Sequence, residues 1–207
     1  MEELSLNILD IAQNSVRANA TRVDITVAEL PAEDRLVITI NDNGCGMTPE
    51  QVAHVEDPFY TTRTTRSVGL GVPLFKMEAE MTGGSFQIDS QLGVGTTLTA
   101  VFKPSSVDMI PLGDINGTVQ LLISCNPTLD FIFYRSLRTG EGERREFSLQ
   151  TAELREVLGE DVPLDTPDVV LWIKDYLADG GPSPRLNLKK SNRRIPRRSI
   201  PLERNGQ

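Results

Sequence analysis

The sequence has 207 residues, a length that suits one large domain or two small ones. Its hydrophobic fraction of 39% and charged fraction of 24% are ordinary for a soluble protein, and no apolar run approaches the roughly 18 residues that a membrane-spanning helix requires. The N-terminus is acidic where a secretory signal would be basic, and the two cysteines have no metal-ligand spacing. We therefore expect a cytoplasmic protein that does not insert into a membrane.

The net charge of −8 is unevenly distributed along the chain. From Arg185 to the end there are eight Lys or Arg residues and one acid, Glu203, which leaves 13 basic and 28 acidic residues elsewhere, a balance of −15. The acidic body should repel nucleic acid, whereas the basic segment could attract it or dock on an acidic surface. Low apolar content after Pro182 predicts that residues 182–207 form a disordered basic tail.

The first predicted element is a helix over residues 5–20. Apolar side chains recur at helical spacing along it: Leu6, Leu9, Ala12 and Val16, with Ile8 and Ile11 widening the stripe. A polar stripe on another face consists of Asn7, Asp10, Asn14 and Arg17. A carboxylate and a carboxamide four residues apart can hold Mg²⁺ or position a water molecule, but such a stripe alone is more typical of a solvated helix face.

Two β-branched runs, 23–28 and 36–40, predict strands joined by a turn at 31–34. The motif Asp42-Asn43-Gly44-Cys45-Gly46 follows directly, and Thr48-Pro49-Glu50 predicts the start of a short helix. An acid at the end of a strand can accept the exocyclic amine of a purine, and the glycines permit close backbone approach. Taken alone, Asp-Asn-Gly is an ordinary hairpin turn.

Residues 58–68 are polar and predict a mobile loop before Gly69-Leu70-Gly71, which leads into a helix over 73–81. Free amides at a helix N-terminus favour phosphate, although a Gly-x-Gly pair is a weak signal by itself. Strands are predicted over 85–90 and 96–102, with a hairpin at 92–95 between them.

The pattern changes after Pro104. Strand-like runs occur at 119–124, 129–134 and 145–149, and helices should begin near Thr151 and at Thr166-Pro167. We interpret 106–181 as a small α+β C-terminal unit of unknown role.

The order of these motifs within the first hundred residues resembles the gyrase, heat-shock chaperone, histidine kinase and mismatch-repair ATPase superfamily. Its N-box is matched by 9–15, its glycine boxes by 42–47, 68–72 and 93–97, and the phenylalanine box of histidine kinases by 57–63. The resemblance covers about residues 4–103. It implies an α+β fold for 1–105, a two-layer α/β sandwich of the Bergerat type in which helices cover one face of a mixed sheet, and it implies binding of ATP with Mg²⁺.

The resemblance also implies roles for individual residues. Asn14 would be the Mg²⁺ ligand, and Asp42 would read the adenine base. Other nucleotide contacts would come from the glycine boxes and their neighbours: Gly44, Gly46, Met47, Val68, Gly69, Leu70, Gly71 and Val72. Arg17, Arg63 and Arg66 are candidates for phosphate, and Thr97 would lie near the adenine because family members place a hydroxyl close to this strand.

Asp10 would be the catalytic residue, but hydrolysing members usually carry Glu at this position. One methylene fewer draws the base back by about 1.5 Å, which favours slow hydrolysis or transfer to a partner over fast turnover. Ser67 replaces the usual first glycine of the second box, which predicts a stiffer lid over the phosphates.

The sequence constrains the class of ATP-binding protein less strongly than it constrains the ATP-binding domain itself. An autonomous histidine kinase carries its acceptor histidine on a helix ahead of this domain, whereas here the match begins near residue 4 and the one histidine is His54. We expect instead a stand-alone ATPase or a protein kinase acting on a protein partner, as related anti-sigma factors do. A non-catalytic nucleotide-dependent switch is the alternative, and a nucleic-acid-associated ATPase is disfavoured by the acidic body.

The whole chain, including the segment 109–114, also resembles small stand-alone ATP-binding proteins found with iron-only hydrogenase gene sets in anaerobic bacteria. That resemblance implies a partner within a hydrogenase-type redox system.

Overall fold

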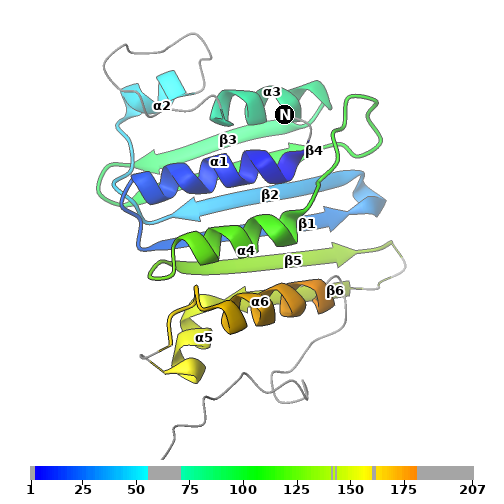
Figure 1. Cartoon of the computed structure of the whole chain (residues 1–207). Coiled ribbons are helices and arrows are strands. Elements are labelled where there is room, and N and C mark those ends of the chain that lie inside the picture. The colour runs from blue at the N-terminus through cyan, green and yellow to red at the C-terminus, as the bar shows by residue number, and fades with distance from the viewer. Residues whose placement is uncertain (1–2, 56–70, 141, 143, 160–161, 181–207) are drawn as a thin grey trace, which may run out of the picture.

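The computed structural model describes residues 3–55, 71–140, 142, 144–159 and 162–180. Its strands form a mixed sheet in the order β3-β4-β2-β1-β5-β6 (Figure 1). Neighbouring strands are antiparallel except for β1 and β5, which are parallel. The strands are β1 (Arg22–Leu30), β2 (Arg35–Asp42), β3 (Ser85–Gln91), β4 (Gly95–Phe102), β5 (Asp130–Arg138) and β6 (Arg144–Gln150).

Helices cover one face of this sheet, and they lie side by side in the order α3, α1, α4, α6 (Figure 1). The long helices are α1 (Leu4–Arg17), α3 (Gly71–Met81), α4 (Ile115–Cys125) and α6 (Pro167–Asp179); the shorter ones are η1 (Pro31–Glu33), α2 (Pro49–Val55) and α5 (Thr151–Leu158). This arrangement confirms the expected two-layer sandwich. Among the described residues, no helix has the length and apolarity needed to span a bilayer.

Alternation along the strands divides the sheet into a core face and an open face. On β2, Leu36, Ile38 and Ile40 are buried under the helices, while the residues between them point to the opposite side and are half-buried. Because Asp42 continues the buried series by two residues, its side chain emerges on the helix-covered face at the end of the strand.

The elements after residue 105 continue the same sheet. Strand β5 pairs with β1 over its length, with Val23 opposite Phe131 and Ile25 opposite Phe133. All four side chains belong to the hydrophobic core that also contains Ile8 of α1. Strands β5 and β6, which lie within the predicted C-terminal unit 106–181, therefore supply one edge of the sheet.

One predicted strand is wrong. Residues 119–124 lie within α4, because a short apolar run cannot by its periodicity alone be distinguished from a buried helix. The buried residues Ile115, Val119 and Leu122 have helical spacing, and Asp114 caps the helix by accepting a hydrogen bond of 2.9 Å from the Gly117 amide.

The predicted first helix is confirmed, and its limits are fixed at both ends. At its C-terminal end Asn19 takes the left-handed conformation, with φ of 57°, as expected of Asn after a helix. At its N-terminal end the Leu4 and Ser5 amides donate to the carbonyls of Pro111 and Leu112, at 3.0 and 2.9 Å. The buried stripe is rotated from the predicted one: it runs through Leu4, Ile8, Ile11, Ala12 and Ser15, and Leu6 is exposed.

A continuous core predicts a single cooperative unfolding transition for the described fold. Phe131→Ala in β5 should lower the free energy of unfolding by about 3–5 kcal/mol, because Phe131 is fully buried and its removal leaves a cavity in the core. Leu171→Ala, at a side chain 60% exposed on α6, should change it by less than about 0.5 kcal/mol. Chemical denaturation followed by circular dichroism and tryptophan fluorescence measures both; two separate transitions would contradict the shared core.

Candidate functional site

The carboxylate of Asp42 is held between a helix and a loop. Its Oδ2 accepts a hydrogen bond of 2.7 Å from the hydroxyl of Ser15 on α1, and its Oδ1 accepts one of 2.9 Å from the Gly44 amide. Each oxygen therefore has one donor and keeps a further lone pair. A half-buried carboxylate in this arrangement is a fixed acceptor for a donor arriving from outside.

The loop after β2 depends on glycine at two positions. A Cβ at Gly44 would lie 2.9 Å from both the Cβ and the carbonyl oxygen of Ala18, at the end of α1. Gly46 has φ of +64°, and a Cβ there would lie 2.0 Å from the carbonyl oxygen of Gln91. The two glycines thus let the loop close simultaneously on α1 and on the β3–β4 hairpin.

Backbone and hydroxyl contacts complete that closure. The Cys45 amide donates to the Ala18 carbonyl at 2.9 Å, and the Met47 amide donates to the Ser90 hydroxyl at 2.9 Å. The Ser90 hydroxyl also lies 2.9 Å from that of Thr96. Thr96 is the register partner of Asp42, and Ser90 is the register partner of Thr96. Asp42, Thr96 and Ser90 therefore form a polar row across β2, β4 and β3 on the helix-covered face.

The structure does not bring Thr97 to this row. Thr97 pairs with Asn41, and its hydroxyl donates to the Asn41 side-chain oxygen at 2.7 Å on the open face. Successive side chains of a strand point to opposite faces, so the hydroxyl on the side of Asp42 belongs to Thr96. Which of two adjacent threonines shares a face with Asp42 depends on the strand register, which a single sequence does not contain.

The polar stripe of α1 lies on a helix that packs beside α3. Gly71, the first residue of α3, sits against Asp10: a Cβ there would lie 3.0 Å from the Asp10 Cβ. Asn14 is half-buried, and its side-chain oxygen accepts a hydrogen bond of 3.0 Å from Arg17, which is exposed. Helix α1 therefore contacts Gly71 through Asp10 and Asp42 through Ser15. Asn14 lies between these two contacts along the helix.

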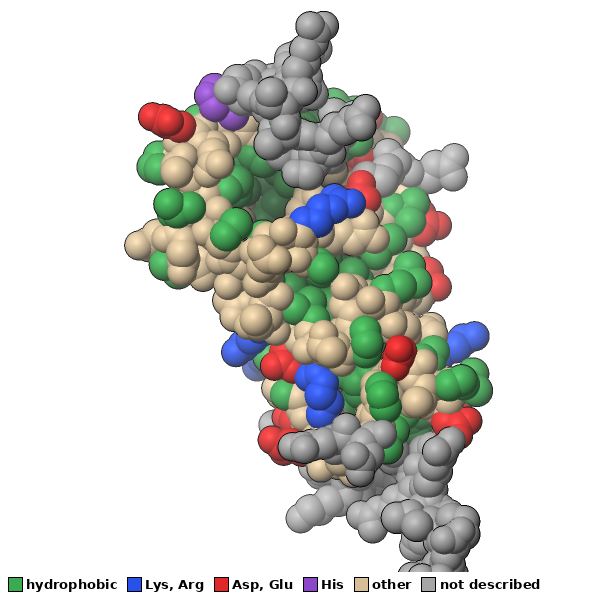
Figure 2. Space-filling view, turned by 60° about the vertical axis from the view of Figure 1, so that its left-hand side comes forward, with side chains coloured by type: hydrophobic (Ala, Val, Ile, Leu, Met, Phe, Trp, Pro, Cys, Tyr) green, Lys and Arg blue, Asp and Glu red, His purple; other side chains and the backbone are tan. Residues whose placement is uncertain are grey.

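Several predicted contacts with the nucleotide fall outside the described residues: Arg63, Arg66, Val68, Gly69 and Leu70. Gly71 and Val72 are described, and both are buried where α3 begins. Figure 2 shows a hollow in this face of the molecule that is walled by hydrophobic side chains.

A buried pair further along the stripe joins α1 to α3. The Asn7 side-chain amide donates to Glu78, and both residues are buried. Burial raises the pKa of Glu78 by penalising its charged form. The side-chain oxygen of Asn7 has no hydrogen-bond partner among the described residues. Asn7 therefore belongs to the packing of the two helices that carry Asp10 and Gly71.

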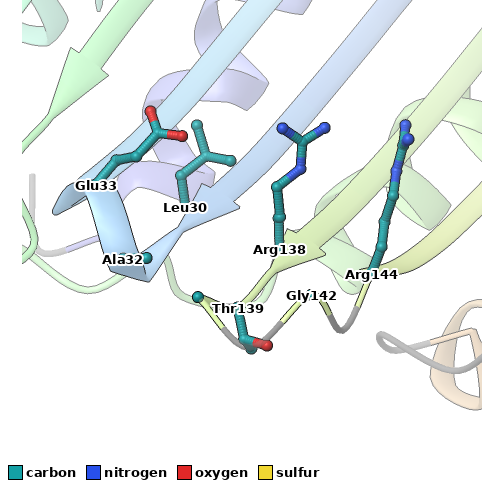
Figure 3. A pocket seen from close by; sticks show the side chains of 8 residues that line it. Leu30, Ala32, Glu33, Arg138, Thr139, Gly142 and Arg144 are labelled. Atoms are coloured by element: carbon teal, nitrogen blue, oxygen red, sulfur yellow. The ribbon is translucent and has the colours of Figure 1, made fainter.

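A separate cavity of about 480 Å³ lies at the opposite end of the strands. Leu30, Glu33, Arg138 and Arg144 contribute to its lining, and Figure 3 shows the two arginine side chains projecting in the same direction. Leu30 pairs with Arg35, at the end of β2 remote from Asp42. This cavity is therefore not part of the site around Asp42.

Comparison with known proteins decides the family. The model for the histidine kinase-, DNA gyrase B- and HSP90-like ATPases matches residues 2–106, half of the chain. The chain belongs to this ATPase family. Membership implies an ATP-binding site, and the matched region contains Asp10, Asn14, Asp42 and Gly71 together with both ends of the site described above.

Relatives of this ATPase domain include bacterial sensor proteins. The chain is 33% identical over 88 residues to a probable C4-dicarboxylate sensor kinase of Bacillus subtilis, and 35% identical over 102 residues to the sensor protein SrrB of Staphylococcus aureus. These matches cover 42% and 47% of this chain but 16% and 17% of the relatives. The chain thus spans about a sixth of the length of those proteins.

A solved structure supports the fold. The N-terminal domain of a DNA repair protein superposes with a TM-score of 0.50 at 13% identity, covering 72% of this chain and 53% of that chain. At that identity the similarity concerns the arrangement of the elements alone.

Two glycines of this ATPase domain offer a matched test of the loop geometry. Gly46 and Gly93 both have positive φ, 64° and 77°, so an alanine at either position incurs a similar backbone strain of about 1 kcal/mol. The Cβ of Gly46→Ala would also clash with the Gln91 backbone, whereas Gly93→Ala would meet nothing within 4 Å. Chemical denaturation should show a loss for Gly46→Ala that exceeds the loss for Gly93→Ala by 1 kcal/mol or more; equal losses would contradict the close approach.

Proposed function

We propose that this protein binds Mg²⁺-ATP between α1 and the loop after β2, and that it acts as an ATPase or as a protein kinase on a partner protein. The supporting observation is the placement of α1, whose Ser15 holds Asp42 while Asp10 lies against Gly71. One helix thereby links the residue suited to the base with the residues suited to the phosphates.

Recognition of the base is assigned to Asp42. Both of its oxygens already accept one hydrogen bond, and an ionised carboxylate has only acceptor positions left. Adenine presents an exocyclic amine donor to such a group, whereas guanine presents an oxo acceptor at the same position. Asp42 would therefore favour adenine, with Thr96 and Ser90 continuing the polar row beside it.

The phosphates are assigned to the N-terminus of α3. Gly71 begins this helix, and the amides of a first helical turn have no partner within the helix, so they favour an anion. The exposed Arg17, one turn beyond Asn14, adds positive charge to the same side of α1.

The donor chemistry of Asn14 fits Mg²⁺. Its amide oxygen accepts from Arg17 and retains a second lone pair, and Mg²⁺ in nucleotide sites usually takes one or two protein oxygens together with phosphate oxygens. Asn14 would thus hold the ion, which when bound neutralises the charge of the triphosphate. The role of this residue is to fix one coordination direction from a rigid helix.

Asp10 is proposed as the general base. Its carboxylate lies beside Gly71, where the phosphates would be, and would accept the proton of an attacking water or of a partner's acceptor group. A shorter side chain than Glu places this base further from the reacting atoms, which favours slow hydrolysis or transfer to a partner.

A protein partner is proposed by analogy with the probable sensor kinase among the relatives of this domain. A kinase transfers phosphate to an acceptor group, which here would be a side chain of the partner. A hydrogenase-type redox system is one such partner implied by the sequence resemblance. The balance of −15 outside the C-terminal basic segment argues against nucleic acid as the substrate.

Isothermal titration with ATP, with and without Mg²⁺, tests the binding site. Asn14→Ala should remove the Mg²⁺-dependent part of the affinity, and Asp42→Asn should weaken ATP binding by about 1–3 kcal/mol because a charged acceptor is lost. Absence of heat for the unaltered protein in both conditions would exclude the site.

Measurements of phosphate release and transfer distinguish a catalytic protein from a nucleotide-dependent switch. Asp10→Asn should retain ATP binding and lose phosphate release and transfer of labelled phosphate to proteins of a cell extract. If the unaltered protein binds ATP without either activity, the protein is a nucleotide-dependent switch and the assignment of Asp10 as a base is wrong.

A further inference from the structure

Ser15 is the side chain that connects α1 to the base-reading carboxylate. It is 3% exposed, and its hydroxyl lies 2.7 Å from Asp42 Oδ2 and 3.5 Å from the Ile11 carbonyl oxygen. A hydroxyl has one proton, and the shorter contact to a charged acceptor is the stronger one. Ser15 therefore donates to Asp42, although a buried serine in a helix more commonly bonds to the carbonyl four residues earlier.

We propose that Ser15 is a positioning residue that sets the preference of the site for adenine. This inference rests on the proposed function and extends it to a residue that does not itself need to touch the nucleotide. Asp42 is the last residue of β2, so the regular strand constrains its side chain only from the preceding residues. The orientation of its carboxylate is instead set by two donors on different elements, Ser15 and the Gly44 amide.

Removing one of these donors has two consequences. The carboxylate becomes able to rotate about its side-chain bonds, so its free lone pairs no longer point in one direction. Its Oδ2 also loses a partner in a half-buried position, which favours a water molecule or the amine of the base as a replacement in a different geometry. Both effects act on the contact with the exocyclic amine and leave the phosphate end unchanged.

The position of Ser15 on the helix explains why it can act selectively. It adjoins Asn14, yet it is buried towards the sheet, whereas Asn14 is half-buried and contacts Arg17. Ser15→Ala retains the Cβ and a good helix former, so it removes the hydroxyl without disturbing the buried apolar neighbours Ile11 and Ala12.

Titrations with ATP and with purine riboside triphosphate, which has no exocyclic amine, test this proposal in the full chain. Ser15→Ala should weaken ATP binding roughly three- to tenfold, the size of one hydrogen bond, and leave the affinity for the analogue unchanged. In the Asp42→Asn background, the same substitution should cause no further loss of ATP affinity.

Ser124→Ala is the matched control. Ser124 is also a helical serine, on α4, and its hydroxyl donates to the Gln120 carbonyl at 2.9 Å. Its removal should change neither affinity.

The failures of the two proposals are distinguishable. If the unaltered protein prefers ATP to the analogue and Ser15→Ala retains that preference, or weakens both ligands equally, the role of Ser15 is refuted while the site stands. If the unaltered protein binds both ligands equally, the assignment of Asp42 to the base fails, and that of Ser15 fails with it.

Discussion

Burial of one face of α1 against the sheet is the constraint on which both the core and the site depend. Leu4, Ile8, Ile11 and Ala12 are almost completely removed from water, and burial of apolar surface is the main favourable term in folding. Once these side chains are fixed, the helix has no freedom to rotate about its axis. The polar residues between them are then held in fixed directions, with Ser15 towards Asp42 and Asp10 towards α3.

The site is therefore assembled from elements that are distant in the sequence, and each element is held in place by a different kind of contact. Asp42 ends a central strand, the following loop is fixed by close packing of two glycines, and Gly71 begins a helix that is joined to α1 by the buried pair Asn7–Glu78. A binding site needs such support, because small displacements of its groups weaken both recognition and chemistry. The C-terminal elements add to this rigidity by pairing β5 with β1 and packing α4 on α1.

Two polar residues beside Asp42, Ser15 and Thr96, are not among the nucleotide contacts predicted from the sequence, although each is adjacent to one that is: Asn14 in one case and Thr97 in the other. For Ser15, the signal was present in the rotation of the helix, since Ile8, Ile11, Ala12 and Ser15 share its buried side. For Thr96, the choice depended on strand register, because a shift of one residue exchanges the two faces of the sheet.

The sequence by itself predicted nearly every helix and strand of residues 1–105 from local patterns, and the resemblance of its motifs to a known superfamily predicted the family and the α+β sandwich. Turns, caps and periodicity depend on neighbouring residues, so they can be recognised without a structure. Only the tertiary structure decided that 119–124 is helical, that β5 joins the sheet beside β1, and which threonine shares a face with Asp42. Each of these depends on contacts between residues far apart in the chain, for which a single sequence contains no local signal.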